Sequence, residues 1–152
     1  MLVADHLWRA DRLAASATRA EGAGDGILAI WGYMHAATHA LNTLLHQEHV
    51  TAESDSCASN HAGQYLDRAG RRVSAFDSRG PVGDLIHTDM PAIEYPTSPQ
   101  LAAAVKLLAA VEASAARALR SDWTPAPSDV AAARSAYRAL AEWLADRRGE
   151  LP

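Results

Sequence analysis

The chain has 152 residues, of which 49% are hydrophobic and 21% charged, and its formal net charge is −4. This composition is that of a single globular domain and excludes an intrinsically disordered chain. The negative charge also argues against non-specific nucleic-acid binding, which needs a basic surface to contact phosphates. A single cysteine, Cys57, excludes an internal disulfide and the cysteine-based zinc motifs.

Two helices are predicted in the first third of the chain, at residues 2–21 and 26–49. Apolar residues recur at helical spacing through the first segment, and the glycine-rich stretch 22–26 ends it. Asp25 then stands where a side chain can cap the start of the next helix. Charged residues among the first positions break the pattern of a secretory signal peptide, so we expect a cytoplasmic protein.

The second predicted helix has no charged residue between Ile27 and Gln47. A stretch of this length raises the question of a membrane span. Its histidines, its threonines and Asn42 are too polar for a hydrocarbon environment, so we expect no membrane association. Such a helix is better explained by burial within the protein on most of its sides.

Residues 50–97 are predicted to be mostly irregular. Glycine and proline interrupt this segment repeatedly, and within it residues 60–72 could form a short helix. Its basic residues are interleaved with aspartates, which indicates a solvated loop rather than a phosphate-binding surface: Arg68, Arg71, Arg72 and Arg79. A connection this long within a compact domain is usually functional, and this one contains His61 and His87.

Two more helices are predicted at residues 99–120 and 128–148. Ser98 followed by Pro99 is a typical helix start, and Gly149 ends the last helix after two arginines that suit its carboxyl-terminal dipole. Alanine, the strongest helix former, is abundant in this part of the chain. Four helices with one long connection between the second and the third predict an all-α fold. We expect a four-helix bundle that forms a single domain over the whole chain.

Five polar side chains of the second helix fall on one face: His35, His39, Asn42, His46 and His49. At 100° per residue they lie within about 80° of arc. An ordinary solvent-facing side would carry lysine, arginine or glutamate, whereas this face carries imidazoles and an amide. Because a buried polar group without a partner costs about 1–3 kcal/mol, this face needs metals, carboxylates or ligand groups as partners.

His35 and His39 are the first-choice metal ligands, because their i, i+4 spacing places both rings on adjacent turns of one face. His46 and His49 begin about 10 Å further along the helix axis, so we do not expect the two pairs to share one mononuclear site. Either one pair binds the metal and the other lines a pocket, or His46 and His49 form a second metal site. The side chains that we expect to contact substrate are Asn42, His46, His49 and Asp89. The alternative is that the histidines are neutral, hydrogen-bonded residues of the core.

Further ligands would come from the facing helices and from the long connection. His6 is a candidate because leucines near it at helical spacing turn it inward. Glu112 continues the apolar stripe of the third helix, although a small shift in register would leave it at the surface. His87 and Asp89 could complete the site or hydrogen-bond a ligating imidazole.

Neutral imidazoles with one carboxylate suit a divalent transition metal such as Fe, Cu or Zn. We therefore expect a metal-binding protein, an oxygenase or hydrolase that activates dioxygen or water to act on a small molecule. The alternative is a non-catalytic ligand-binding or accessory protein with a histidine-lined polar groove, for example a pH-sensitive interface. A nuclease or toxin is disfavoured by the acidic charge. Trp123 and Trp143 are candidates for a homodimer contact.

Overall fold

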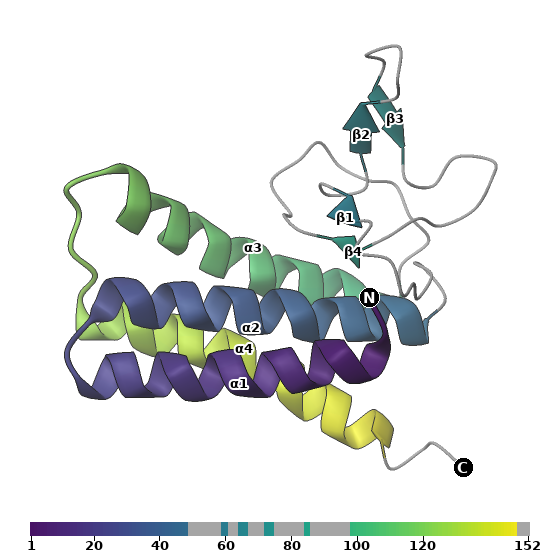
Figure 1. Ribbon diagram of the computed structural model, residues 1–152, viewed down its shortest axis with the longest axis horizontal. Helices are drawn as coiled ribbons and strands as arrows, with labels where there is room; N and C mark the ends of the chain where they lie inside the picture. The colour runs from purple at the N-terminus through teal and green to yellow at the C-terminus, as the bar shows by residue number, and fades with distance from the viewer. Residues whose placement is uncertain (49–58, 61–63, 67–71, 75–83, 86–97, 149–152) are drawn as a thin grey trace.

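The computed structural model describes residues 1–48, 59–60, 64–66, 72–74, 84–85 and 98–148 (Figure 1). Its helices are α1 (Val3–Gly22), α2 (Gly26–Gln47), α3 (Pro99–Arg120) and α4 (Pro127–Arg148). They form the predicted all-α bundle, and each predicted boundary that falls on described residues lies within two residues of the observed one. The turns that join α1 to α2 and α3 to α4 lie at the same end of the bundle (Figure 1).

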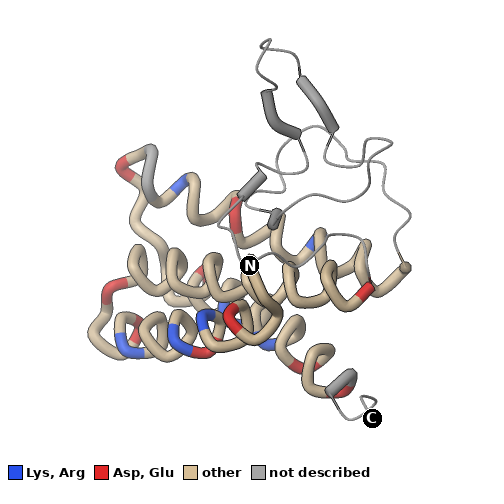
Figure 2. The backbone as a smooth tube through the Cα atoms, turned by 45° about the vertical axis from the view of Figure 1, so that its right-hand side comes forward, with Lys and Arg blue, Asp and Glu red and all other residues tan. Residues whose placement is uncertain are grey.

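The central helix is α2, which packs against all three other helices. Charged residues mark α1, α3 and α4, whereas α2 is free of them along its whole length (Figure 2). Large side chains from three helices meet in the core, among them Ile30, Leu41, Leu45, Leu101, Leu108 and Leu140. Burial by neighbouring helices therefore explains the uncharged sequence. No described helix is both long and apolar enough to cross a membrane.

Local capping fixes the helix starts where the sequence predicts them. Asp25 accepts a hydrogen bond from the backbone N–H of Leu28 at 3.0 Å. The preceding residue, Gly24, has a φ of 79°, a backbone conformation that glycine adopts easily. Ser98 accepts a hydrogen bond from the N–H of Leu101 at 3.1 Å, and its hydroxyl lies 3.0 Å from the carboxylate of Glu48 just after α2. Ser98 therefore joins the end of α2 to the start of α3.

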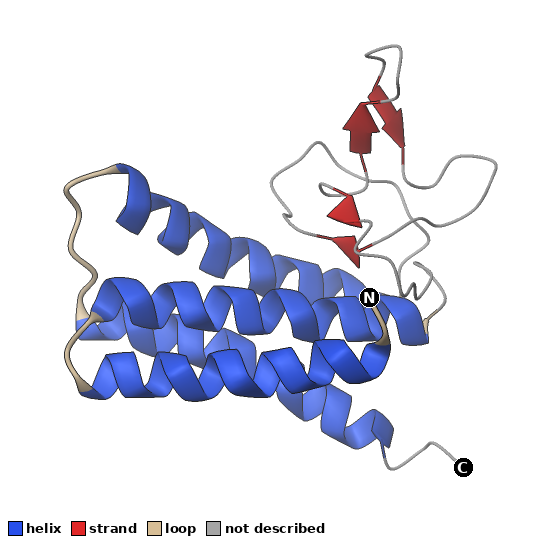
Figure 3. Cartoon of the chain, viewed as in Figure 1, coloured by secondary structure: helices blue, strands red, loops and turns tan. Residues whose placement is uncertain are grey.

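The described residues between α2 and α3 form four short strands (Figure 3). Strand β1 (Ser59–Asn60) pairs in parallel with β4 (Asp84–Leu85), and β2 (Gln64–Leu66) pairs antiparallel with β3 (Arg72–Ser74). The prediction of a short helix over residues 60–72 is therefore wrong at β2. Tyr65 and Val73, which are partners in the register of this pair, are residue types that are common in strands.

Helices α1 and α2 approach each other closely at Gly32. A Cβ atom at this position would lie 2.8 Å from the Cβ atom of Ala17 on α1, closer than two carbon atoms can pack. Glycine is therefore required for this contact between the two helices. The antiparallel pairing of α1 with α2 is fixed by this close approach together with the short turn between them.

A polar group joins three helices near the turn end of the bundle. The buried hydroxyl of Tyr33 on α2 donates a hydrogen bond to Glu21 on α1 at 2.9 Å and lies 3.1 Å from the hydroxyl of Thr18. Arg134 on α4 forms an ion pair with the other carboxylate oxygen of Glu21 at 2.6 Å. Burial raises the pKa of Tyr33 above its ordinary value, and the carboxylate of Glu21 acts in the same direction.

Trp123 and Trp143, the candidates for a dimer contact, are half-buried and pack against the core. The more exposed tryptophan side chains of the described helices are Trp8 and Trp31, on α1 and α2.

Candidate functional site

The centre of the candidate site is His6, which lies near the start of α1 and is 1% exposed. Its two ring nitrogens face two different histidines of α2. The Nδ1 atom lies 2.8 Å from Nδ1 of His39, and the Nε2 atom lies 3.3 Å from Nε2 of His46. We call His6, His39 and His46 the histidine cluster. His46 is 4% exposed and His39 is half-buried.

The ring of His6 is tilted relative to the rings of His39 and His46 and is not stacked on either of them. The ring centroids of His6 and His39 are 5.1 Å apart with an angle of 51° between the planes. Those of His6 and His46 are 5.2 Å apart at 46°. In both contacts a ring nitrogen faces a ring nitrogen, which is the arrangement of hydrogen bonds between imidazoles.

The antiparallel pairing of α1 with α2 brings the cluster together. Because Ala17 lies opposite Gly32, a residue eleven positions earlier on α1 lies opposite a residue eleven positions later on α2. His6 therefore faces the region of Thr43, between His39 and His46. These two histidines are two helical turns apart, so both rings point to the same side and can reach one ring from α1.

From the sequence, the predicted site is a pair of histidines on α2, and His6 is one of several candidates for an additional ligand. The burial of His6 is correctly predicted, but its position between His39 and His46 is not. The signal was present in the short turn at residues 22–26, because a tight turn between two straight helices fixes which positions face each other.

The predicted pair of His35 and His39 has two different sets of neighbours. The ring of His35 meets the ring of Trp31 edge to face, with centroids 4.6 Å apart, whereas His39 contacts His6. Asn42 lies on the same side of α2 as the cluster and is 1% exposed. Its Nδ2 atom donates a hydrogen bond to the backbone carbonyl of Thr38 at 3.0 Å, which fixes the orientation of its amide.

Glu112 is buried in α3 at 8% exposure, as its place in the apolar stripe of that helix predicts. The other predicted site residues, His49, His87 and Asp89, lie outside the residues that the structure describes. Strand β4, at the start of the segment that contains His87 and Asp89, contacts α2. Among the described residues, no three or more His, Cys, Asp or Glu side chains form a group that could by itself hold a metal ion.

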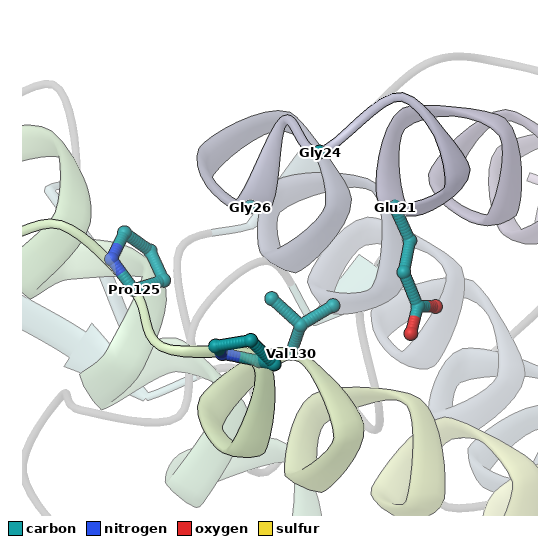
Figure 4. Close-up of a pocket in the computed structure, with 6 residues that line it drawn as sticks. Glu21, Gly24, Gly26, Pro125 and Val130 are labelled. Carbon is teal, nitrogen blue, oxygen red and sulfur yellow. The ribbon is translucent and has the colours of Figure 1, made fainter.

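A pocket of about 120 Å³ lies at the opposite end of the bundle, between the two turns (Figure 4). Its lining residues are Glu21, Gly24, Gly26, Pro125, Pro127 and Val130. Ligand sites are commonly larger, about 300–1,000 Å³. Both oxygens of its only carboxylate, that of Glu21, already accept hydrogen bonds from Tyr33 and Arg134. The histidine cluster is therefore the stronger candidate for function.

Comparisons of the chain with protein families, with curated proteins and with solved structures found no match.

Proposed function

We propose that the chain is a metal-binding helical-bundle protein that holds a divalent transition metal, Fe, Cu or Zn, at the histidine cluster. We further propose that it is a cytoplasmic metalloenzyme, an oxygenase or hydrolase that activates dioxygen or water to act on a small molecule. The observation that carries the proposal is the meeting of three imidazoles from two helices, with ring nitrogens 2.8 Å and 3.3 Å apart.

Burial strengthens this argument. Two rings of the cluster are almost fully removed from water, so bulk water does not compete for their ring nitrogens. Imidazole is a common ligand of Zn, Cu and Fe, and bundle proteins build metal sites from side chains on facing helices. A site with few protein ligands leaves coordination positions for water, dioxygen or substrate.

A second candidate is a non-catalytic ligand-binding or accessory protein. It is favoured by a specific feature of the cluster, namely that three neutral imidazoles can satisfy one another. Each neutral ring has one N–H donor and one acceptor nitrogen, so a chain from His39 through His6 to His46 needs no metal to complete its two contacts. In that case the histidines are polar core residues that line a ligand or partner groove.

Elemental analysis of untagged protein, followed by Zn²⁺ titration, tests the proposal. We expect stoichiometric metal in the wild type and its loss in His6→Gln, since His6 contacts both other rings of the cluster. We expect His35→Ala to keep its metal, because His35 lies against Trp31 instead. Circular dichroism of each variant checks that the helices remain folded.

Two results would overturn the proposal. One is wild-type protein that contains no metal and binds no Zn²⁺, which would favour the non-catalytic candidate. The other is a folded His6→Gln variant that binds Zn²⁺ as tightly as the wild type. Loss of metal in His35→Ala but not in His6→Gln would show that the metal binds at His35 and His39, the pair predicted from the sequence.

A further inference from the structure

The outer face of α1 carries an exposed tryptophan. Trp8 precedes Ala17 by nine residues, which is about two and a half helical turns. Because Ala17 packs against Gly32 of α2, Trp8 lies on the opposite side of α1 and points away from α2. Its side chain is 58% exposed. Trp8 therefore belongs to the surface, whereas Trp123 and Trp143 pack against the core.

Two charges of opposite sign flank Trp8 on the same face of α1. Asp5 precedes it by three residues and Arg12 follows it by four, so the three side chains fall within about 60° of arc. Both charged residues are exposed. The Cζ atom of Arg12 lies 5.3 Å from the centroid of the Trp8 ring, which is a cation–π contact. We call Asp5, Trp8 and Arg12 the outer stripe of α1.

The two charges of the outer stripe are too far apart to pair with each other. Seven residues separate them, which is about 10 Å along a helix. Neither Asp5 nor Arg12 forms an ion pair with another side chain in the described part of the chain. The helix dipole explains an acidic residue in the first turn of α1, but it gives no reason for an exposed tryptophan followed by an arginine.

A second copy of the outer stripe complements the first when the two helices run antiparallel. A two-fold axis places one residue of each chain against a different residue of the other chain, twice over. With the axis between positions 8 and 9, Asp5 of each chain lies opposite Arg12 of the other, and the two Trp8 rings meet at the centre. A parallel pairing in register would instead place like charges against each other.

Going beyond the proposed function, we infer that the outer stripe is a homodimer interface in which two α1 helices pack antiparallel around Trp8. A single exposed apolar residue is common on protein surfaces, so the self-complementary charges on both sides of Trp8 decide the assignment. Tryptophan and arginine are also enriched among the residues that contribute most to binding at interfaces. The exposed Trp31 lacks such a pattern, because α2 has no charged residue to direct a partner helix.

The size of this contact determines how strong the dimer is. One helix from each chain forms an interface at the small end of the known range, below about 1,200 Å² in total. Interfaces of this size belong to weak complexes, so we expect a dimer that dissociates on dilution.

Sedimentation equilibrium at about 1–300 μM protein tests the interface, because weak complexes associate in this range. We expect the wild type to change from monomer to dimer. We expect Trp8→Ala to weaken the dimer by more than about 100-fold, since the two-fold axis counts the loss of the central ring twice. The control is Lys106→Glu, which reverses an exposed charge on α3 and should leave the dissociation constant unchanged.

Exchange of the two charges tests the antiparallel arrangement. Asp5→Arg and Arg12→Asp each place like charges opposite one another at two symmetry-related contacts, so we expect either variant to weaken the dimer about tenfold. The double variant restores opposite charges at both contacts and should recover most of this loss. Circular dichroism of each variant checks that the helices remain folded.

Three results would each overturn the inference. The first is a wild type that stays monomeric over the whole concentration range, and the second is a folded Trp8→Ala variant with the dissociation constant of the wild type. The third is a double variant that dimerises no better than either single variant. None of these measurements involves a metal, so the dimer and the proposed function can fail independently.

Discussion

The hydrogen bond from Tyr33 to Glu21 requires that the hydroxyl of Tyr33 keeps its proton. Its O–H donates to Glu21, which is held by Arg134, so that three helices meet at one hydrogen-bonded group. Ionised Tyr33 would lose this donor and would place a second negative charge beside the carboxylate. Burial and the hydrogen bond therefore both favour the neutral phenol in the folded protein.

This environment predicts a loss of stability in alkaline solution. Because the pKa of Tyr33 is raised by folding above the ordinary value of 10.0, its contribution is complete below pH 10. It decreases as the pH rises from there through the pKa of the folded state, since the unfolded chain ionises first. Urea unfolding between pH 8 and 11 should show a steeper alkaline loss for the wild type than for Tyr33→Phe.

At pH 8 the variant Tyr33→Phe should be less stable than the wild type by about 1 kcal/mol, the typical value for one hydrogen bond. The side chain of Glu21 is 26% exposed, so water can replace part of the lost interaction. Equal alkaline slopes for the two proteins would show that Tyr33 titrates as in the unfolded chain.

For single residues, the sequence predicts whether a side chain is buried better than it predicts which side chains it contacts. His6 and Glu112 are both buried, as their places in apolar stripes indicate. The spacing of His35 and His39 on one helix, however, says nothing about which ring a neighbouring helix brings to them. That information depends on how α1 is paired with α2, which a periodicity within one helix does not contain.

At the scale of elements, helix boundaries were the most predictable feature because local side chains determine them. Asp25 and Ser98 cap the two helices that they were predicted to start, and each accepts a hydrogen bond from the backbone N–H three residues later. The short strands were not predicted. Segments of two or three residues are too short for an alternating pattern, and their pairing depends on contacts distant in sequence.

Two glycines give a matched test of the packing of α1 on α2. We expect Gly32→Ala to destabilise the protein by about 1–3 kcal/mol, because the new methyl group would overlap the Cβ atom of Ala17. We expect Gly22→Ala to be neutral or slightly stabilising, since no atom lies within 4 Å of the position that its methyl group would take and alanine favours helix.

Thermal or urea unfolding of the two variants measures the difference between them. The chemical change is the same in both, so intrinsic helix propensity alone would stabilise both proteins. Similar stability of Gly32→Ala and Gly22→Ala would show that α1 can move away from α2 at little cost.

For the whole molecule, the proposed metal site would connect the start of α1 with the last turns of α2. The residue before α1 is Leu2, which offers no side-chain acceptor for the first N–H groups of the helix. A ligand that binds only the folded protein stabilises it in proportion to the logarithm of its concentration.

Zn²⁺ should therefore raise the thermal midpoint of the wild type. At a free concentration of 100 times Kd the stabilisation is about 2.7 kcal/mol. For a chain of this size that corresponds to an increase of about 5–10 °C. A chelator should reverse the increase, and His6→Gln should show none. An equal increase in His6→Gln would place the bound ion elsewhere in the protein.

The close contact between Ala17 and Gly32 acts as a pivot for α1. His6 lies eleven residues from Ala17, which is about 16 Å along a helix. A tilt of about 5° at the pivot would displace the His6 ring by about 1.4 Å, enough to break a hydrogen bond or a metal bond. The position of His6 relative to the histidines of α2 therefore depends on the absence of a side chain at Gly32, which lies far from these rings.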